Sequence, residues 1–173
     1  MSRRDAEAFA DFVAARSSAL HRAAYLMVGD AQLAQDLVQE ALTKTYVAWP
    51  RLRDASRVEA YTRKAITTTA IGWFRKKSWG ERTVETMPDG GQAGHADDVD
   101  QRAWLWQALQ ELPVRQRAAI VLRYYEDLTE AQTADAMGCA VGTVKSQVSS
   151  GLRKLRDRLG ADVLPTDLIE VTR

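Results

Sequence analysis

Residues 128–148, LTEAQTADAMGCAVGTVKSQV, have the pattern of a short helix, a tight turn and a second helix. Thr129 is placed to cap the first helix, and Gln132, three residues later, completes a capping box. Gly138 supplies the residue type that most readily adopts the left-handed conformation found at the end of a helix. The segment therefore predicts a helix-turn-helix unit.

The second helix of this unit is expected to have one buried face and one face turned to DNA. An apolar stripe runs along it at helical spacing, formed by Val144, Val148, Leu152, Leu155 and Leu159. At about 100° per residue, small hydroxyl groups and one cation gather on the opposite side: Ser146, Ser149, Ser150 and Arg153. A helix of this kind fits the major groove, so the unit is predicted to read duplex DNA.

The net charge of +1 conceals a strong segregation of charge along the chain. Residues 1–80 carry 13 Lys and Arg against 8 Asp and Glu, whereas residues 81–100 carry 1 against 6. Residues 101–160 are basic again, with 9 against 6. The chain therefore consists of two basic bodies joined by an acidic connector, a pattern that the average charge does not reveal.

Other classes of protein are disfavoured by what the composition lacks. The single Cys139 excludes an internal disulfide, and with only His21 and His95 beside it we expect no metal site. No signal peptide and no apolar run approaching a membrane span are present, so we expect a cytoplasmic protein without membrane insertion. No Gly-rich phosphate loop or nucleophile–histidine pair accompanies the carboxylates, so we expect neither an enzyme, nor a cofactor, nor a small-molecule substrate.

The rest of the chain also has helical periodicity, and no segment shows the alternation of a strand, so we predict an all-α fold. The first helix is expected to end near Gly29, the second to run from about Ala31 to Trp49, and the third from Val58 to about Trp79. The second helix is predicted to turn five residues inward: Leu33, Leu37, Ala41, Leu42 and Thr45.

A change of composition separates two predicted domains. Residues 81–98 are rich in Gly and acidic residues, with little to bury, which is typical of a flexible acidic linker. We therefore predict an N-terminal helical domain at 1–80, the linker at 81–98, a C-terminal helix-turn-helix domain at 99–160, and a short tail at 161–173. Pro113 is expected to open a new helix within the second domain.

Two helix faces of the first domain stand out. The third helix combines cations at both ends with Tyr61, Trp73, Phe74 and Trp79, a mixture suited to phosphates and unpaired bases. The alternative is a basic surface helix whose aromatic residues belong to the core. The second helix carries an acidic and amide-rich face, which is either a solvated surface or a docking site for a protein partner.

These features together resemble a known family. The run DLVQE at 36–40, the basic-aromatic helix at 60–79, the pair Leu112-Pro113 before an Arg-rich helix, and VGTVKS at 141–146 are similar to RNA polymerase sigma factors of the sigma-70 family. The short layout resembles the extracytoplasmic-function (ECF) class, in particular an actinobacterial, Streptomyces-type subgroup. The resemblance covers about residues 6–160.

The resemblance implies an alternative sigma factor that binds core RNA polymerase and directs it to promoters. Its partners would be the clamp of the largest subunit and the flap region of the polymerase, promoter DNA, and an anti-sigma factor. The first domain would capture and open the −10 element, with one base extruded into a pocket, and the second would read the −35 element as duplex. The acidic linker would thread the polymerase cleft.

The resemblance also assigns roles to individual residues. Core polymerase would be bound by Gln32, Asp36, Gln39, Glu40 and Thr43. The −10 DNA would be bound by Asp54, Ser56, Arg57, Tyr61, Arg63, Lys64, Thr68, Trp73, Arg75, Lys76 and Lys77. The −35 DNA would be bound by Thr143, Lys145, Ser146, Ser149, Ser150 and Arg153.

Three positions depart from the pattern of the family. Thr68 stands where relatives often carry Asn, and it lacks the paired donor and acceptor of the amide. Ser150 stands where Arg is common, which weakens contact with −35 DNA. Thr133 replaces an Ile and is a poorer core residue. These departures alter the expected promoter preference and leave the family resemblance intact.

A stand-alone transcriptional regulator is the alternative reading, because many regulators carry a helix-turn-helix. Its N-terminal helices would then sense a ligand or form a dimer. A basic-aromatic helix has little use in such a sensor domain, so the sequence favours the sigma factor. Binding to free promoter duplex discriminates the two, since a regulator binds tightly alone whereas a sigma factor needs core polymerase.

Overall fold

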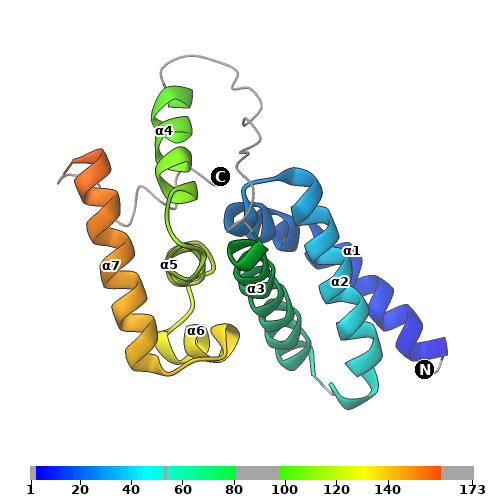
Figure 1. The fold of residues 1–173 in the computed structure, drawn as a ribbon. Coiled ribbons are helices and arrows are strands. Elements are labelled where there is room, and N and C mark those ends of the chain that lie inside the picture. Colours follow the sequence, from blue (N-terminus) through cyan, green and yellow to red (C-terminus); the bar gives the residue numbers. More distant parts are fainter. Residues whose placement is uncertain (1–2, 53, 81–97, 161–173) are drawn as a thin grey trace.

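The computed structural model describes residues 3–52, 54–80 and 98–160, and every regular element in these ranges is a helix (Figure 1). The all-α prediction is confirmed. The N-terminal half contains α1 (Arg3–Val28), α2 (Ala31–Ala48), the 3-10 turn η1 (Trp49–Arg51) and α3 (Ala55–Gly80). The C-terminal half contains α4 (Asp98–Gln110), α5 (Val114–Ile120), the π-helical turn η2 (Val121–Tyr125), α6 (Glu130–Met137) and α7 (Val141–Leu159). The predicted tail, and the predicted linker apart from Asp98, lie outside the described residues.

Short-range signals in the sequence decide where most helices begin and end. Gly29, with φ of 77°, ends α1, and the Asp30 carboxylate then accepts a hydrogen bond from the Leu33 amide at 2.8 Å to cap α2. Thr129 and Gln132 form the predicted capping box at the start of α6. Gly138 ends that helix in the left-handed conformation, with φ of 62° and ψ of 42°. The local predictions for the helix-turn-helix are therefore confirmed.

Two details of the predicted helices are wrong. Helix α3 begins at Ala55 instead of Val58, because the Asp54 carboxylate accepts a hydrogen bond from the Arg57 amide at 2.9 Å and caps the helix earlier. Leu33 was predicted to face inward and is 42% exposed. It lies about 90° around the helix from the centre of the buried stripe, which consists of Ala34, Leu37, Val38, Ala41 and Thr45.

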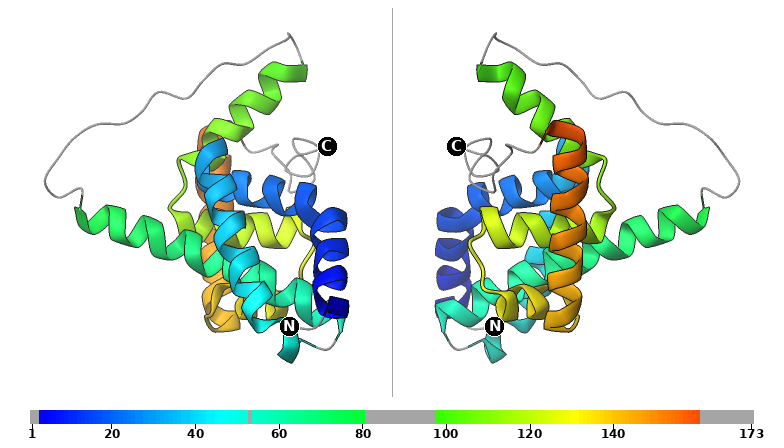
Figure 2. Two further views of the ribbon diagram at one scale, coloured as in Figure 1. Left: turned by 90° about the vertical axis from the view of Figure 1, so that its right-hand side faces the viewer. Right: turned by 90° about the vertical axis from the view of Figure 1, so that its left-hand side faces the viewer.

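The two halves pack against each other, and α3 lies against α5 and α6 (Figures 1 and 2). One continuous apolar cluster extends through both, with Met27 and Leu37 from the N-terminal half and Ile120, Leu122 and Leu155 from the C-terminal half. The C-terminal end of α3 projects beyond the other helices (Figure 2). The pattern of the sequence predicts two helical bodies but not this contact between them.

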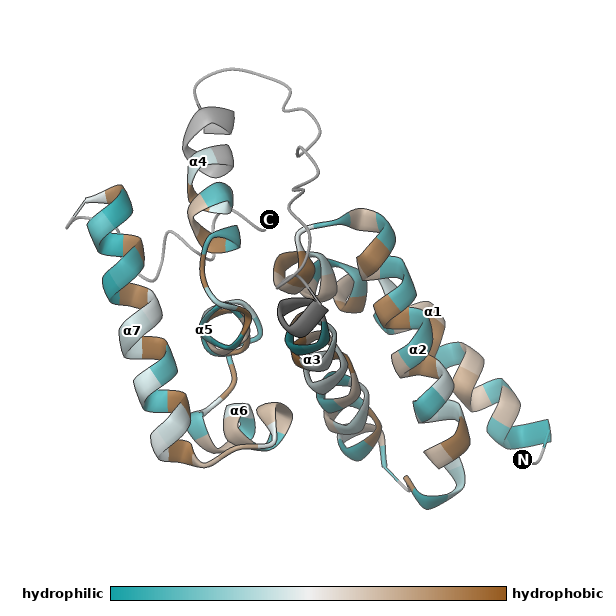
Figure 3. Ribbon diagram, viewed as in Figure 1, coloured by the Kyte–Doolittle hydropathy of each residue, from teal (hydrophilic) through white to brown (hydrophobic). Residues whose placement is uncertain are grey.

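The predicted apolar stripe of α7 packs on α5 and α6. Val144, Leu155 and Leu159 are buried, and apolar bands recur along the helix between hydrophilic ones (Figure 3). Gly151 is also buried in this contact, and a Cβ added there would lie 2.6 Å from Ile120 Cδ1. The close approach of α7 to α5 therefore depends on a glycine that the apolar pattern did not single out.

Thr133 occupies a core position of α6, as its place in the family pattern implies. Its side chain is fully buried, and its Oγ1 has no hydrogen-bond partner among the described residues. A buried hydroxyl without a partner costs about 1–3 kcal/mol. We expect Thr133→Val to raise the free energy of unfolding by about 1 kcal/mol, measured by chemical denaturation.

The control for this prediction is Thr45, which is equally buried in α2. Its hydroxyl donates to the Ala41 carbonyl at 2.8 Å and lies 3.0 Å from Thr62 Oγ1. Thr45→Val removes a satisfied group, so it is expected to lower the stability. A loss of stability in both variants would show that the Thr133 hydroxyl is not an unpaired group.

Candidate functional site

Helix α7 lies on the side of the C-terminal half that is turned away from α1 and α2 (Figure 1), and most of its predicted DNA-reading residues are exposed. Lys145 is 62% exposed at the side chain and lies 3.5 Å from the Glu130 carboxylate. The Ser146 hydroxyl donates to the Thr143 carbonyl at 2.9 Å. The six residues lie along one side of the helix: Lys145, Ser146, Ser149 and Arg153 are exposed, and Thr143 and Ser150 are half-buried. The structure thus brings this predicted set together on an open surface.

The start of α3 is organised by Asp54. Its carboxylate accepts hydrogen bonds from the Ser56 hydroxyl and the Arg57 amide, and it lies 3.3 Å from the Arg57 guanidinium. The hydrogen bond from Ser56, followed by that from the Arg57 amide, lowers the pKa of Asp54 below its usual value. Asp54 therefore holds the first turn of α3 and orients Ser56 and Arg57, both of which are exposed.

The predicted −10 residues differ in exposure along α3. Half-buried positions are Arg63, Lys64 and Trp73, whereas Tyr61, Thr68, Arg75 and Lys76 are exposed. The side chain of Lys77 lies outside the described residues. The Trp73 and Phe74 side chains pack against the apolar cluster, so these two aromatic residues belong in part to the core.

The two half-buried cations of α3 are paired with carboxylates. Arg63 lies 2.9 Å from Glu59 and 3.0 Å from Glu126, and Lys64 lies 2.9 Å from Asp135. Glu59 also pairs with Arg16 of α1, so an ion network runs from α1 through α3 to the C-terminal half. Sequence reasoning missed Glu126 and Asp135, because the pattern assigned no role to either side chain and both residues lie far from α3 in the chain.

A buried arginine forms a second link between the halves. Arg117 is only 5% exposed, lies 5.5 Å from the centre of the Phe74 ring, and donates to the Gln110 side chain and the Leu112 carbonyl. Burial lowers the pKa of Arg117 to about 10. Gln110 Nε2 in turn donates to the Leu26 carbonyl of α1 at 3.1 Å. This polar network was also absent from the sequence-based prediction.

The proposed docking residues lie on α2. Gln32 donates to Asp36 at 3.2 Å, and the Thr43 hydroxyl donates to the Gln39 carbonyl at 2.8 Å. Glu40 is half-buried and lies 2.7 Å from Lys44, whereas the other four residues of the set are exposed.

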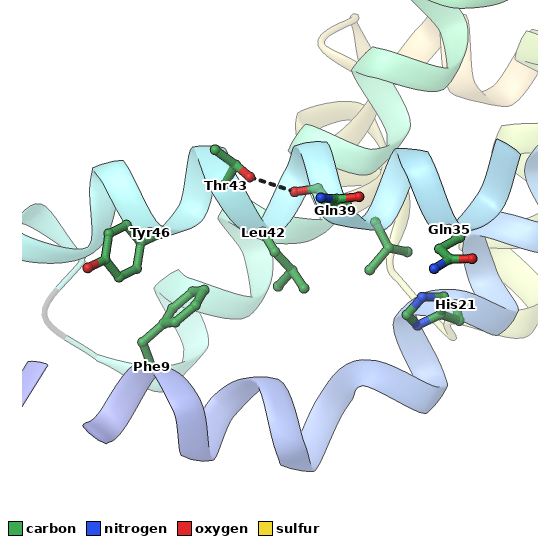
Figure 4. A pocket seen from close by; sticks show the side chains of 8 residues that line it. Phe9, His21, Gln35, Gln39, Leu42, Thr43 and Tyr46 are labelled. Atoms are coloured by element: carbon green, nitrogen blue, oxygen red, sulfur yellow. Dashed lines mark hydrogen bonds between the residues drawn. The ribbon is translucent and has the colours of Figure 1, made fainter. Parts of the chain in front are cut away.

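A groove of about 530 Å³ runs between α1 and α2 beside this face (Figure 4). Gln39 and Thr43 line it together with apolar side chains of both helices, including Phe9, Leu42 and Tyr46. The docking set therefore borders a hollow in which a partner side chain can be buried, a feature that the sequence did not predict.

Within residues 3–52, 54–80 and 98–160, no three His, Cys, Asp or Glu side chains are grouped to hold a metal ion. In the same ranges, no helix is long and apolar enough to span a membrane. Cys139 is a half-buried free thiol beside the turn of the helix-turn-helix.

Two family models match the chain, each on one of the two halves. Residues 12–80 match sigma-70 region 2, and residues 102–155 match sigma-70 region 4. The region 2 match contains α2 and α3. The region 4 match runs from α5 through α6 to the greater part of α7.

Relatives and a solved structure agree with these matches. The chain is 35% identical to the RNA polymerase sigma-E factor of Streptomyces coelicolor over 94% of this chain and 92% of that protein. It is 30% identical to the RNA polymerase sigma factor SigV of Bacillus subtilis over 80% of this chain and 83% of that protein. The sigma factor RpoE from Bartonella quintana, solved with the anti-sigma factor NepR, superposes with a TM-score of 0.69 and 25% identity over 91% of this chain and 99% of that one. The chain therefore belongs to the sigma-70 family of RNA polymerase sigma factors, within its extracytoplasmic-function class.

Proposed function

We propose that this chain is an alternative sigma factor that binds core RNA polymerase, directs it to −35 and −10 promoter elements and helps to open the DNA. The observation that carries the proposal is the presence of two separate basic surfaces, on α3 and on α7, in the two halves that match sigma-70 regions 2 and 4. As a transcription initiation factor it needs no catalytic centre or cofactor of its own. We place its action in the cytoplasm, where polymerase and promoter DNA meet.

The −35 element is read by α7. Lys145 and Arg153 supply cations to phosphates, and Thr143, Ser146, Ser149 and Ser150 supply short hydroxyl groups to the groove. Strong discrimination between bases comes from bidentate hydrogen bonds, and four small hydroxyl side chains make few of these. This anchor is therefore weak alone, and the assembled holoenzyme provides the specificity.

The −10 element is opened and held by α3. Arg57, Arg75 and Lys76 are exposed cations, and the half-exposed ring of Tyr61 lies on the same helix. Cations bind the phosphates of the separated strand, and an exposed aromatic ring stacks on an unpaired base. Arg63, Lys64, Thr68, Trp73 and Lys77 complete the proposed set, together with the helix-organising Asp54 and Ser56.

Core polymerase is bound by the face of α2 formed by Gln32, Asp36, Gln39, Glu40 and Thr43. The face offers carboxylate and amide groups beside an apolar groove, a combination that suits the basic and apolar side chains of a protein partner. We assign the clamp of the largest subunit to this face and the flap region to the C-terminal half.

We propose residues 1–80 and 99–160 as separate functional domains, with the acidic segment 81–98 in the polymerase cleft. An anti-sigma factor is a further proposed partner, since the Bartonella relative was solved in complex with one.

The experiment that tests the proposal is transcription with reconstituted components. Start sites mapped after overexpression supply the promoter, and purified core polymerase is then assayed on it with and without this chain. We expect initiation at the mapped sites only when both are present. A chain that binds the same duplex tightly and specifically without core polymerase, and does not support initiation, is a stand-alone regulator instead.

The contribution of α7 is tested through the salt dependence of promoter binding. In the holoenzyme, Lys145→Ala and Arg153→Ala are each expected to weaken binding and to reduce the slope of log K against log salt by about 0.9, because each removes one phosphate contact. The control is Arg4→Ala, which removes an exposed cation from α1 and leaves α7 unaltered. Equal slopes for all three variants would place the DNA on another face of α7.

A further inference from the structure

A second groove lies at the end of the N-terminal half where the beginning of α1, the turn η1 and the beginning of α3 meet (Figure 2). Its volume is about 830 Å³, and every residue that lines it lies between Asp5 and Glu59 of the chain. The groove is open because α1 and α3 contribute short side chains to its walls, at Ala8, Ala15 and Ala55. It is therefore a feature of the N-terminal half alone, to which the C-terminal half contributes nothing.

The walls of this groove are largely apolar. Large apolar side chains line it: Phe12, Trp49, Pro50, Leu52 and Val58. The Trp49 ring lies 5.2 Å from that of Phe9, which in turn lies 5.1 Å from that of Tyr46. Phe9 and Tyr46 line the groove of Figure 4, so this aromatic cluster separates the two grooves. Apolar side chains gathered at an open surface are typical of a site where another molecule is bound.

The groove is also acidic, on a half of the chain that is otherwise basic. It is lined by four of the eight Asp and Glu of residues 1–80: Asp5, Asp11, Asp54 and Glu59. Arg16 is the one cation among the lining residues, and it pairs with Glu59. Asp54 is held by Arg57, so the exposed carboxylate of Asp11 is well placed to meet an occupant. We call this site the acidic groove.

The charge of the acidic groove decides between the possible occupants. Carboxylates repel the phosphates of a nucleic acid, so DNA does not fit. The segments of this chain outside the described residues are acidic as well, with 4 Asp and Glu against 1 Arg in 81–97 and 3 against 1 in 161–173. Like charge disfavours both of them. A protein segment that combines large apolar side chains with Lys or Arg satisfies both the walls and the charge.

We propose that the acidic groove is a docking site for a cationic amphipathic helix of a protein partner. The apolar face of that helix packs against Phe12 and Trp49, and its cations meet Asp11. Because Asp54 lines the groove and also organises the first turn of α3, the occupant lies beside the turn that carries Ser56 and Arg57. The site is distinct from the docking residues of α2, and the inference does not rest on the proposed function.

The test measures binding of the free, full-length chain to a fluorescein-labelled amphipathic helical peptide of leucine and lysine, by fluorescence anisotropy. Ala8→Trp fills the groove without changing its charge. It is expected to weaken binding about tenfold, because an apolar side chain of the peptide loses its place. The matched control, Ala10→Trp, adds the same ring at an exposed position about 160° around α1 and should leave binding unchanged. Equal affinities of these two variants, both shown to be folded by circular dichroism, overturn the proposal.

A charge variant tests the acidic character of the groove. Asp11→Lys is expected to weaken binding of the same peptide about tenfold, because it places like charges together. Asp157→Lys makes the same change of net charge at an exposed position of α7 and should have little effect. An analogue of the peptide with glutamate in place of lysine should not bind the unaltered chain. Equal losses in the two variants, or equal binding of the two peptides, overturn the proposal.

Two other occupants would give different results. Weaker binding of a fluorescein-labelled oligo(dT) by Ala8→Trp, but not by Ala10→Trp, would assign the groove to DNA. Self-association of the unaltered chain in sedimentation, abolished by Ala8→Trp, would assign it to a second copy. Either result overturns the proposal. The proposed function is tested separately, by initiation with the unaltered chain and core polymerase, so each can fail without the other.

Discussion

Replacing Asp36 by lysine is expected to abolish stable binding of the chain to core polymerase. Asp36 is exposed in the middle of the α2 face, and the contact described for it is the hydrogen bond from Gln32 on the same helix. Reversal of its charge places a cation against the basic partner surface that the acidic face is proposed to meet. Juxtaposed like charges cost several kcal/mol at an interface, and every 1.4 kcal/mol corresponds to about a tenfold loss of affinity. We therefore expect affinity to fall about 100-fold or more.

The structure favours Asp36 over Glu40 for this test. Glu40 pairs with Lys44 at 2.7 Å, and Lys44 also donates to the Thr69 hydroxyl of α3 at 2.9 Å. A change at Glu40 would disturb the contact between α2 and α3, whereas Asp36→Lys leaves it in place.

Asp157→Lys is the control for Asp36→Lys, because it makes the same change of charge at an exposed position of α7. Fluorescence titration of labelled chain with core polymerase gives the affinities, and denaturation confirms that both variants are folded. Nonspecific binding of the free chain to duplex DNA through α7 should be unchanged by Asp36→Lys. If Asp36→Lys binds core polymerase with the same affinity as Asp157→Lys, α2 is not the docking face.

Arg117→Ala is expected to lower the free energy of unfolding by about 3 kcal/mol, the largest effect on stability that we predict. The change leaves a cavity beside Phe74 and removes the donors that serve the Gln110 side chain and the Leu112 carbonyl. Those acceptors are then left without their donors in a site where Arg117 itself is only 5% exposed. Denaturant titration followed by circular dichroism measures the loss.

Two variants separate the causes of this loss. Arg115→Ala removes the same side chain from an exposed position of the same helix and is expected to change stability by less than about 0.5 kcal/mol. Arg117→Met refills most of the volume without supplying donors, so it should recover the part of the loss due to the cavity. A small effect of Arg117→Ala, similar to that of Arg115→Ala, would mean that the buried network contributes little.

Local features of this fold were predictable because the interactions that make them span three or four residues. The capping box of Thr129 and Gln132, the left-handed Gly138 and the stripe on α7 follow from residue type and spacing alone. The set of exposed residues on α7 was predictable for the same reason, because the periodicity of a single α-helix decides which of its side chains lie on the same face. The assignment of Leu33 failed at the edge of such a stripe, where periodicity gives no sharp boundary.

The amino-acid sequence by itself determined the helices, most of their ends, the helix-turn-helix and the family. Only the tertiary structure decided that Arg63 meets Glu126 across 63 residues, that Lys64 meets Asp135 across 71, and that Arg117 is buried over Phe74. It also decided that Gly151, rather than a residue of the apolar stripe, sets the approach of α7 to α5. The physical reason is that such contacts depend on how separate helices pack, which no spacing along a single helix encodes.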